Sequence, residues 1–86
     1  MKNLERTLKA LANKRRLAIL QYLKREKEAT VGDIAAEIKL SFTATSKHLS
    51  VLSAADIVDK DQRGLEMWYR IAVGQTPAAK HIISLL

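Results

Sequence analysis

The chain has 86 residues, 48% of them hydrophobic, and its 15 Lys and Arg exceed its nine Asp and Glu to give a net charge of +6. This length fits one compact domain and excludes two, and the hydrophobic content excludes a mainly disordered chain. The absence of cysteine excludes disulfides, thiolate metal sites and cysteine nucleophiles.

Two amphipathic helices are predicted at the start of the chain. Leu4, Leu8 and Leu11 recur at helical spacing and predict a helix over Asn3–Ala12. A second apolar stripe predicts a helix over Lys14–Lys27. Lys14, Arg15 and Arg16 lie in the first turn of this second helix, where the helix dipole disfavours positive charge. They are either a solvated surface or contacts to phosphate, and the sequence gives both interpretations equal weight.

The next two predicted helices are short and joined by a tight turn. Thr30 is a candidate N-cap for a helix that ends near Lys39. Ser41 is the next candidate N-cap, and the helix after it is predicted over Phe42–Ala55. Because the second of these helices is polar on its outer side, the pair predicts a helix-turn-helix over about 30–55.

A β-hairpin and a last helix complete the predicted fold. Two alternating runs, Ile57–Gln62 and Leu65–Ile71, predict a hairpin, or wing, over about 57–71. The Arg-Gly pair between them is a weaker turn signal than Asn-Gly, so we expect a loop longer than two residues. A Thr-Pro pair opens a last helix over 77–86. The expected fold class is mainly α with a small β-hairpin, a winged helix-turn-helix that occupies residues 1–86 as a single domain.

Short polar side chains and one cation occupy the outer face of the predicted fourth helix. Such side chains let a helix lie deep in the major groove of DNA and reach base edges. The cluster also fits ordinary helix-surface polarity, and the lysine has the reach for either guanine or phosphate. We assign the arginine at the hairpin tip to the minor groove or its flanking phosphates, and the other two hairpin cations to phosphates, if the hairpin lies along the DNA backbone. The residues expected to contact duplex DNA are Thr43, Ser46, Lys47, Ser50, Lys60, Arg63 and Arg70.

The first and last predicted helices each carry an apolar stripe that the core and the wing do not need to cover. Pairing these stripes about a two-fold axis buries them and sets two DNA-reading helices about 34 Å apart, one turn of the duplex. We therefore expect a homodimer whose terminal helices, about 3–12 and 77–86, form the interface. The residues expected there are Leu4, Leu8, Leu11, Ile82, Ile83 and Leu86.

Several segments resemble the ArsR-type family of small bacterial and archaeal winged-helix repressors. Leu40–Leu52 is similar to the recognition helix of that family, and Leu8–Leu20 resembles its opening helices. Ala54–Val58 and Met67–Ile71 resemble the exit from the recognition helix and the wing. The resemblance implies a homodimeric DNA-binding transcriptional repressor with the same dimer interface. It also raises His48 from a structural histidine to an equal candidate for a DNA contact.

The chain departs from the family pattern at three places. Asp56 stands where glycine is usual. Leu65 and Glu66 follow the wing glycine where a basic residue is usual, which weakens the expected grip of the wing on DNA. Phe42 stands where a polar base-reading residue is common, and it either contacts a thymine methyl group or packs in the core.

Metal sensing does not carry over from the family. The last helix offers only His81, and a tetrahedral site needs several ligands, so we expect no metal and no cofactor.

No effector site is recognised in the sequence. No nucleophile–base pair or carboxylate dyad indicates an enzyme. No long apolar run, secretory signal or lipidation motif is present, so we expect a cytoplasmic protein without a membrane partner. The alternative function is a winged-helix module that contacts protein and not DNA.

Overall fold

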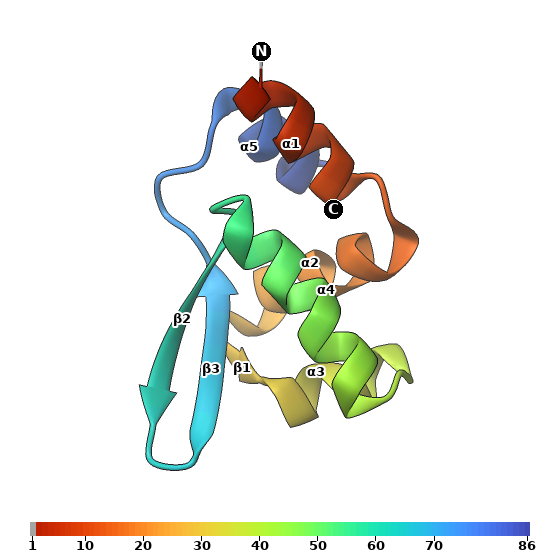
Figure 1. Ribbon diagram of the computed structural model, residues 1–86, viewed down its shortest axis with the longest axis vertical. Helices are drawn as coiled ribbons and strands as arrows, with labels where there is room; N and C mark the ends of the chain where they lie inside the picture. Colours follow the sequence, from red (N-terminus) through yellow and green to blue (C-terminus); the bar gives the residue numbers. More distant parts are fainter. Residues whose placement is uncertain (1) are drawn as a thin grey trace.

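The computed structural model describes residues 2–86, which form five helices and three strands (Figure 1). In chain order these are α1 (Lys2–Leu11), α2 (Lys14–Glu26), β1 (Ala29–Thr30), α3 (Val31–Ile38), α4 (Phe42–Ala54), β2 (Val58–Arg63), β3 (Glu66–Ile71) and α5 (Pro77–Ser84). The mainly helical winged helix-turn-helix predicted from the sequence is confirmed, and β1 is an addition that the pattern did not reveal. None of the helices within residues 2–86 is long and apolar enough to cross a membrane.

Polar side chains cap the start of four helices. The predicted N-cap Thr30 is confirmed and forms a capping box with Asp33: the Asp33 backbone N–H donates to the Thr30 hydroxyl at 3.1 Å, and the Thr30 N–H donates to the Asp33 carboxylate at 3.4 Å. Each of the other caps accepts a backbone N–H bond from the first turn of its helix. The capping residues are Asn13, Thr30, Ser41 and Thr76. These local bonds are why the sequence located the helix starts well.

A three-stranded antiparallel sheet replaces the expected two-stranded hairpin. Its strand order is β1-β3-β2, and β1 pairs Thr30 with Trp68. A strand of two residues is too short to show alternation in the sequence. The expectation of a longer wing loop was wrong, because Arg63 pairs with Glu66 and leaves only Gly64 and Leu65 in the turn. Gly64 has φ 63°, which suits a two-residue hairpin turn.

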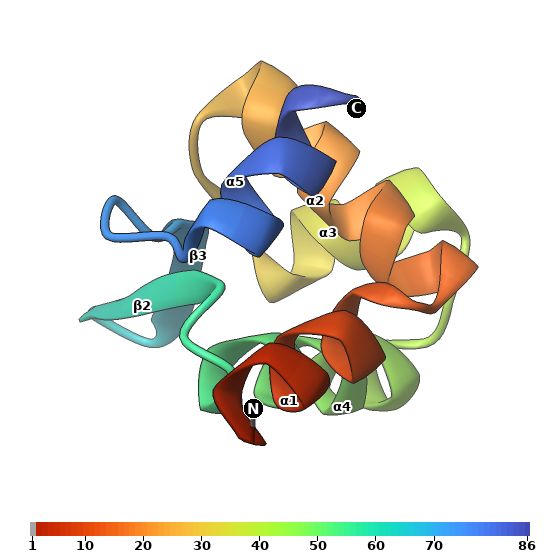
Figure 2. The same cartoon turned by 90° about the horizontal axis from the view of Figure 1, so that it is seen from above.

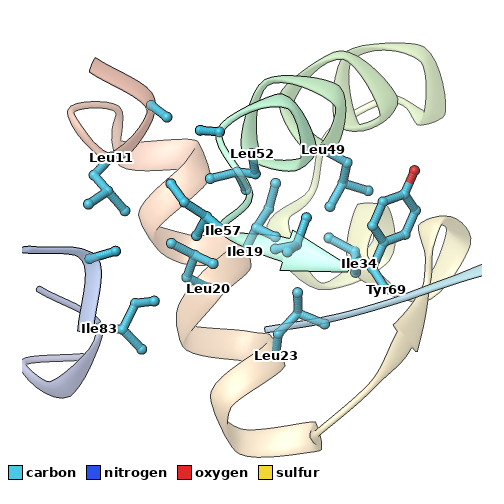
Figure 3. Packing of buried hydrophobic residues seen from close by; sticks show 14 of the residues in the cluster. Leu11, Ile19, Leu20, Leu23, Ile34, Leu49, Leu52, Ile57, Tyr69 and Ile83 are labelled. Carbon is cyan, nitrogen blue, oxygen red and sulfur yellow. The ribbon is translucent and has the colours of Figure 1, made fainter. Parts of the chain in front are cut away.

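The core lies between all five helices and the inner face of the sheet (Figure 3). Ile19 and Leu20 of α2 are fully buried in the same cluster as Leu49 and Leu52 of α4. Tyr69 of β3 is also buried and anchors the wing to the helices. Burying such side chains is the main stabilising contribution in a domain of this size.

The terminal helices α1 and α5 lie side by side at one end of the molecule (Figures 1 and 2). Leu11 and Ile83 are only 4% and 8% exposed and belong to the core of this chain, which corrects their assignment to a dimer interface. The apolar stripes of α1 and α5 partly cover one another. Fewer apolar side chains than expected therefore remain exposed for a dimer interface. Leu4 and Leu8 of α1 remain 41% and 45% exposed.

Candidate nucleic-acid interface

A three-residue turn joins α3 to α4. Lys39 ends α3 in the left-handed conformation, with φ 56° and ψ 50°, and its backbone N–H donates to the carbonyl of Ala35. The N–H of Leu40 donates to the same carbonyl at 3.1 Å. The chain therefore reverses within one turn, and Ser41 begins α4 at a fixed angle to α3.

One face of α4 packs in the core and the other is exposed. Thr45, Leu49 and Leu52 are fully buried, and the Thr45 hydroxyl donates to the Ser41 carbonyl at 2.8 Å. The predicted DNA contacts on the opposite side are the exposed Thr43, Lys47 and Ser50, and the half-buried Ser46. Figure 2 shows α4 along one edge of the molecule. The structure thus brings these four side chains onto one accessible helix surface.

Phe42 does not pack in the core. Its surface is 61% exposed at the first turn of α4, and it borders a shallow groove together with Leu65 of the wing turn. Leu65 is fully exposed. Of the two roles considered for Phe42, core packing is therefore wrong, and contact with a thymine methyl group stays a prediction.

His48 has a partner inside the protein. Its Nδ1 lies 3.2 Å from Nη1 of Arg16, and the Nε and Nη2 of Arg16 donate to the carbonyls of Ala10 at 2.6 Å and Lys9 at 3.2 Å. A guanidinium has only donors, so Nδ1 accepts and the imidazole is neutral. Arg16 therefore connects the end of α1 to the side of α4, a role that its place in a run of three cations did not indicate.

We expect His48 to make folding stability depend on pH. Burial lowers the pKa of His48 in the fold, and the nearby Arg16 and Arg15 lower this pKa further. The unfolded chain has a histidine pKa of about 6.5, so below that pH the unfolded state binds more protons. The His48 contribution to the free energy of unfolding is thus fully present above about pH 6.5 and decreases as the pH falls through the lower folded value.

Urea unfolding at about pH 7.5 and about pH 5.5 measures this loss. His48→Gln should reduce the difference between the two pH values, whereas His81→Gln, which changes an exposed residue of α5, should leave it unchanged. An undiminished pH dependence in His48→Gln would contradict the assignment.

The wing arginine folds back onto the sheet. The Nη1 and Nη2 of Arg63 donate to the two carboxylate oxygens of Glu28 at 3.0 and 2.8 Å, and Nη2 also donates to Asp61 at 3.1 Å. The Arg63 guanidinium carbon lies 5.0 Å from the ring centroid of Trp68. The hydrogen bond from Arg63 lowers the pKa of Glu28. Arg63 is therefore bound to partners within the protein. The structure does not hold it extended toward a minor groove, as the sequence predicted.

The other cations predicted to contact DNA differ in whether they have an ion-pair partner within the protein. Arg70 is half-buried with its Nη1 3.6 Å from the Asp61 carboxylate. Lys60 is exposed on β2 and has no ion-pair partner within residues 2–86. In the same described range, Lys14 and Lys47 are also exposed without such a partner. These free lysines are among the cations available to a polyanion.

No group of three or more His, Cys, Asp or Glu within residues 2–86 could hold a metal ion.

The segment that contains the helix-turn-helix matches a known protein family. The sequence profile of the bacterial regulatory proteins of the ArsR family matches residues 13–60, from the cap of α2 into β2. This chain belongs to the ArsR family.

Known proteins resemble this ArsR-family chain over most of its length. The transcriptional activator HlyU of Vibrio cholerae is 32% identical over 79 residues, which cover 92% of this chain and 72% of HlyU. The solved structure of reduced HlyU has a TM-score of 0.83 at 32% identity and covers 99% of this chain and 85% of its own.

Two further solved structures bear on the fold of this ArsR-family chain. A homodimeric winged helix-turn-helix DNA-binding domain of a possible ArsR-family regulator from Mycobacterium bovis has a TM-score of 0.83 at 32% identity, over 98% of this chain and 74% of its own. The transcriptional repressor PagR of Bacillus anthracis has a TM-score of 0.80 at 28% identity, over 98% and 92%.

One departure from the ArsR pattern has a clear local setting. Asp56 has φ 58° in the turn between α4 and β2, a conformation that glycine adopts freely and that aspartate tolerates. The Asp56 backbone N–H donates to the Ser53 carbonyl at 3.0 Å, and its carboxylate lies 3.6 Å from the guanidinium of Arg6. The turn therefore keeps its shape without glycine.

Proposed function

We propose that this ArsR-family regulator binds duplex DNA as a homodimer and represses transcription from the cytoplasm. The observation that carries the proposal is the division of α4 into a fully buried face and an exposed face of short polar side chains. An exposed helix of this kind fits the major groove. Thr43, Ser46 and Ser50 then read base edges, with Phe42 against a thymine methyl group.

Free lysines supply the attraction that does not depend on sequence. Lys14 at the start of α2, Lys47 on α4 and Lys60 on β2 are exposed and available to phosphates, which contribute most of the salt-dependent affinity for DNA. We assign His48 a positioning role through Arg16, since its Nδ1 already accepts from Arg16.

The homodimer uses the apolar side chains that α1 and α5 leave at the surface. Leu4 and Leu8 on α1 are 41% and 45% exposed, and Ile82 and Leu86 on or after α5 are half-buried. The Mycobacterium bovis domain of similar fold is described as homodimeric, which supports this choice. A dimer places two α4 helices about one duplex turn apart.

Repression needs only occupancy of the promoter, whereas activation needs an additional contact with the transcription machinery. The similar PagR is named a repressor and HlyU an activator. A reporter gene placed behind a selected binding site tests the choice. Expression should fall when the regulator is produced, and a rise would overturn repression while leaving DNA binding intact.

Selection of duplexes from a random-sequence pool tests DNA binding directly. We expect enrichment of a palindrome whose half-sites lie about 10 base pairs apart, as a two-fold dimer requires. Affinity for the enriched duplex should fall steeply with salt, with a slope of about −0.9 for each phosphate contacted. No enrichment, or binding that salt does not change, would overturn the proposal.

Lys47→Ala should weaken binding to the selected duplex about tenfold. If Lys47 contacts a phosphate, the loss should be equal for all sequences and the salt slope should fall by about one. If it contacts guanine, preference for that base should be lost instead. Lys80→Ala, which removes an exposed lysine from α5, is the matched control and should change neither quantity. An unchanged affinity in Lys47→Ala would remove Lys47 from the interface.

A protein-binding module is the second candidate function. Phe42 and Leu65 are large exposed apolar side chains on either side of one groove, and such groups are common where proteins bind one another. The same duplex selection separates the two functions, because a protein-binding module does not enrich a DNA sequence.

A further inference from the structure

The wing is electrically neutral in a strongly basic chain. The whole protein has a net charge of +6. The charged residues of the wing are Lys60, Arg63 and Arg70 against Asp59, Asp61 and Glu66. Two of the three cations are also engaged by carboxylates within the protein. The wing therefore offers DNA much less positive potential than its arginines suggest.

Glu28 is the carboxylate that fixes the wing arginine in place. It lies in the connection between α2 and β1, and its two oxygens accept from both terminal nitrogens of Arg63. Bidentate pairs of this kind fix the guanidinium plane as well as its position. The Trp68 ring covers one face of the same guanidinium. Both terminal nitrogens and one face of the Arg63 guanidinium thus already have partners within the protein.

We propose that Glu28 limits the DNA affinity of this regulator by holding Arg63 away from the phosphate backbone. The inference rests on the proposed function. A phosphate competes with the Glu28 carboxylate for the guanidinium of Arg63, so the wing arginine contributes less to binding in the unmodified protein than a free arginine would. Removing the Glu28 charge releases the guanidinium from its bidentate partner and lets Arg63 pair with DNA.

Asp61 contributes less to this restraint than Glu28. Its carboxylate is shared between Arg63 at 3.1 Å and Arg70 at 3.6 Å. It also belongs to the wing itself, whereas Glu28 lies outside the wing, in the connection that follows α2. The Glu28–Arg63 pair therefore restrains the arginine relative to α4, the helix that we propose enters the groove.

Glu28→Gln is the direct test. We expect affinity for the selected duplex to rise about threefold to tenfold, since an exposed but bidentate ion pair is released. The salt slope should also steepen by about one phosphate contact. Glu66→Gln is the matched control: it removes one negative charge from the wing itself, yet Glu66 has no ion pair within residues 2–86. Its affinity should rise less than about twofold.

A double-variant cycle attributes the gain to the arginine. Arg63→Gln alone should stay within about twofold of the parent affinity. In the Glu28→Gln background, Arg63→Gln should abolish the gain. A gain that survives the loss of Arg63, a gain equal to that of Glu66→Gln, or a strong loss in Arg63→Gln alone would each overturn the inference.

A measurement without DNA separates the inference from the proposed function. The Glu28 carboxyl should titrate below its ordinary range in the free protein, as its bond from Arg63 requires, and Arg63→Gln should return it toward that range. An unchanged titration would show that the restraint does not exist in solution. If the restraint is present but no duplex binds any variant, the proposed function fails and the inference fails with it.

Discussion

Introducing Leu4→Glu and Leu8→Glu together should convert the homodimer into a monomer and reduce affinity for a two-half-site duplex by at least about a hundredfold. Both leucines are large, partly exposed apolar side chains on one helix face of α1. Placing carboxylates there buries unpaired charge in the interface, which costs more than the interface gains. Sedimentation at low micromolar concentration measures the halved mass, and titration of the selected duplex measures the loss of affinity.

The matched control for this change is Leu65→Glu. Leu65 is even more exposed than Leu4 and Leu8 of α1. It lies in the wing turn, at the opposite end of the molecule from α1 (Figure 1). The Leu65→Glu variant should keep the mass of the dimer in sedimentation. A double variant that sediments as a dimer, or a parent protein that sediments as a monomer, would contradict an interface on α1.

Arg16→Ala should lower the free energy of unfolding by about 2–3 kcal/mol. The substitution removes charge-assisted bonds to two carbonyls at the end of α1 and the bond to the imidazole of His48. The shortest of these, to Ala10, is only partly accessible to water, so the carbonyl does not fully regain a partner. The corresponding decrease in the thermal midpoint is about 10–20 °C for a domain of this size. Urea and thermal unfolding measure both values.

Arg15→Ala is the matched control for that loss. Arg15 precedes Arg16 in the same helix turn, yet its side chain donates no hydrogen bond to another side chain or carbonyl in the part of the chain that the structure describes. Its effect should stay below about 0.5 kcal/mol. Equal losses in the two variants would mean that the Arg16 contacts contribute nothing specific.

The helices were predictable from sequence because their signals are local. Thr30, Ser41 and Thr76 each cap a helix through the backbone of the next few residues, and apolar spacing marks the buried face of each helix. The same spacing assigned Thr43 and Lys47 to the exposed face of α4. Their contact with DNA remains a prediction, because residue type and exposure do not identify a partner.

The missed features all depend on contacts between distant parts of the chain. Arg63 and Glu28 are 35 residues apart, and Arg16 and His48 are 32 apart, so no local pattern joins them. The two-residue strand β1 exists only because β3 pairs with it. Leu11 looked free for a partner subunit because the sequence did not reveal that α5 packs against α1.

The guanidinium of Arg16 touches the last turn of α1 and the middle of α4 at the same time. In the proposed dimer α1 faces the sister subunit and α4 faces DNA, so Arg16 is one of the side chains that join the seam between subunits to the reading surface. A compound or modification that tilts α1 at that seam would therefore also act on α4, without first reshaping the wing or the sheet.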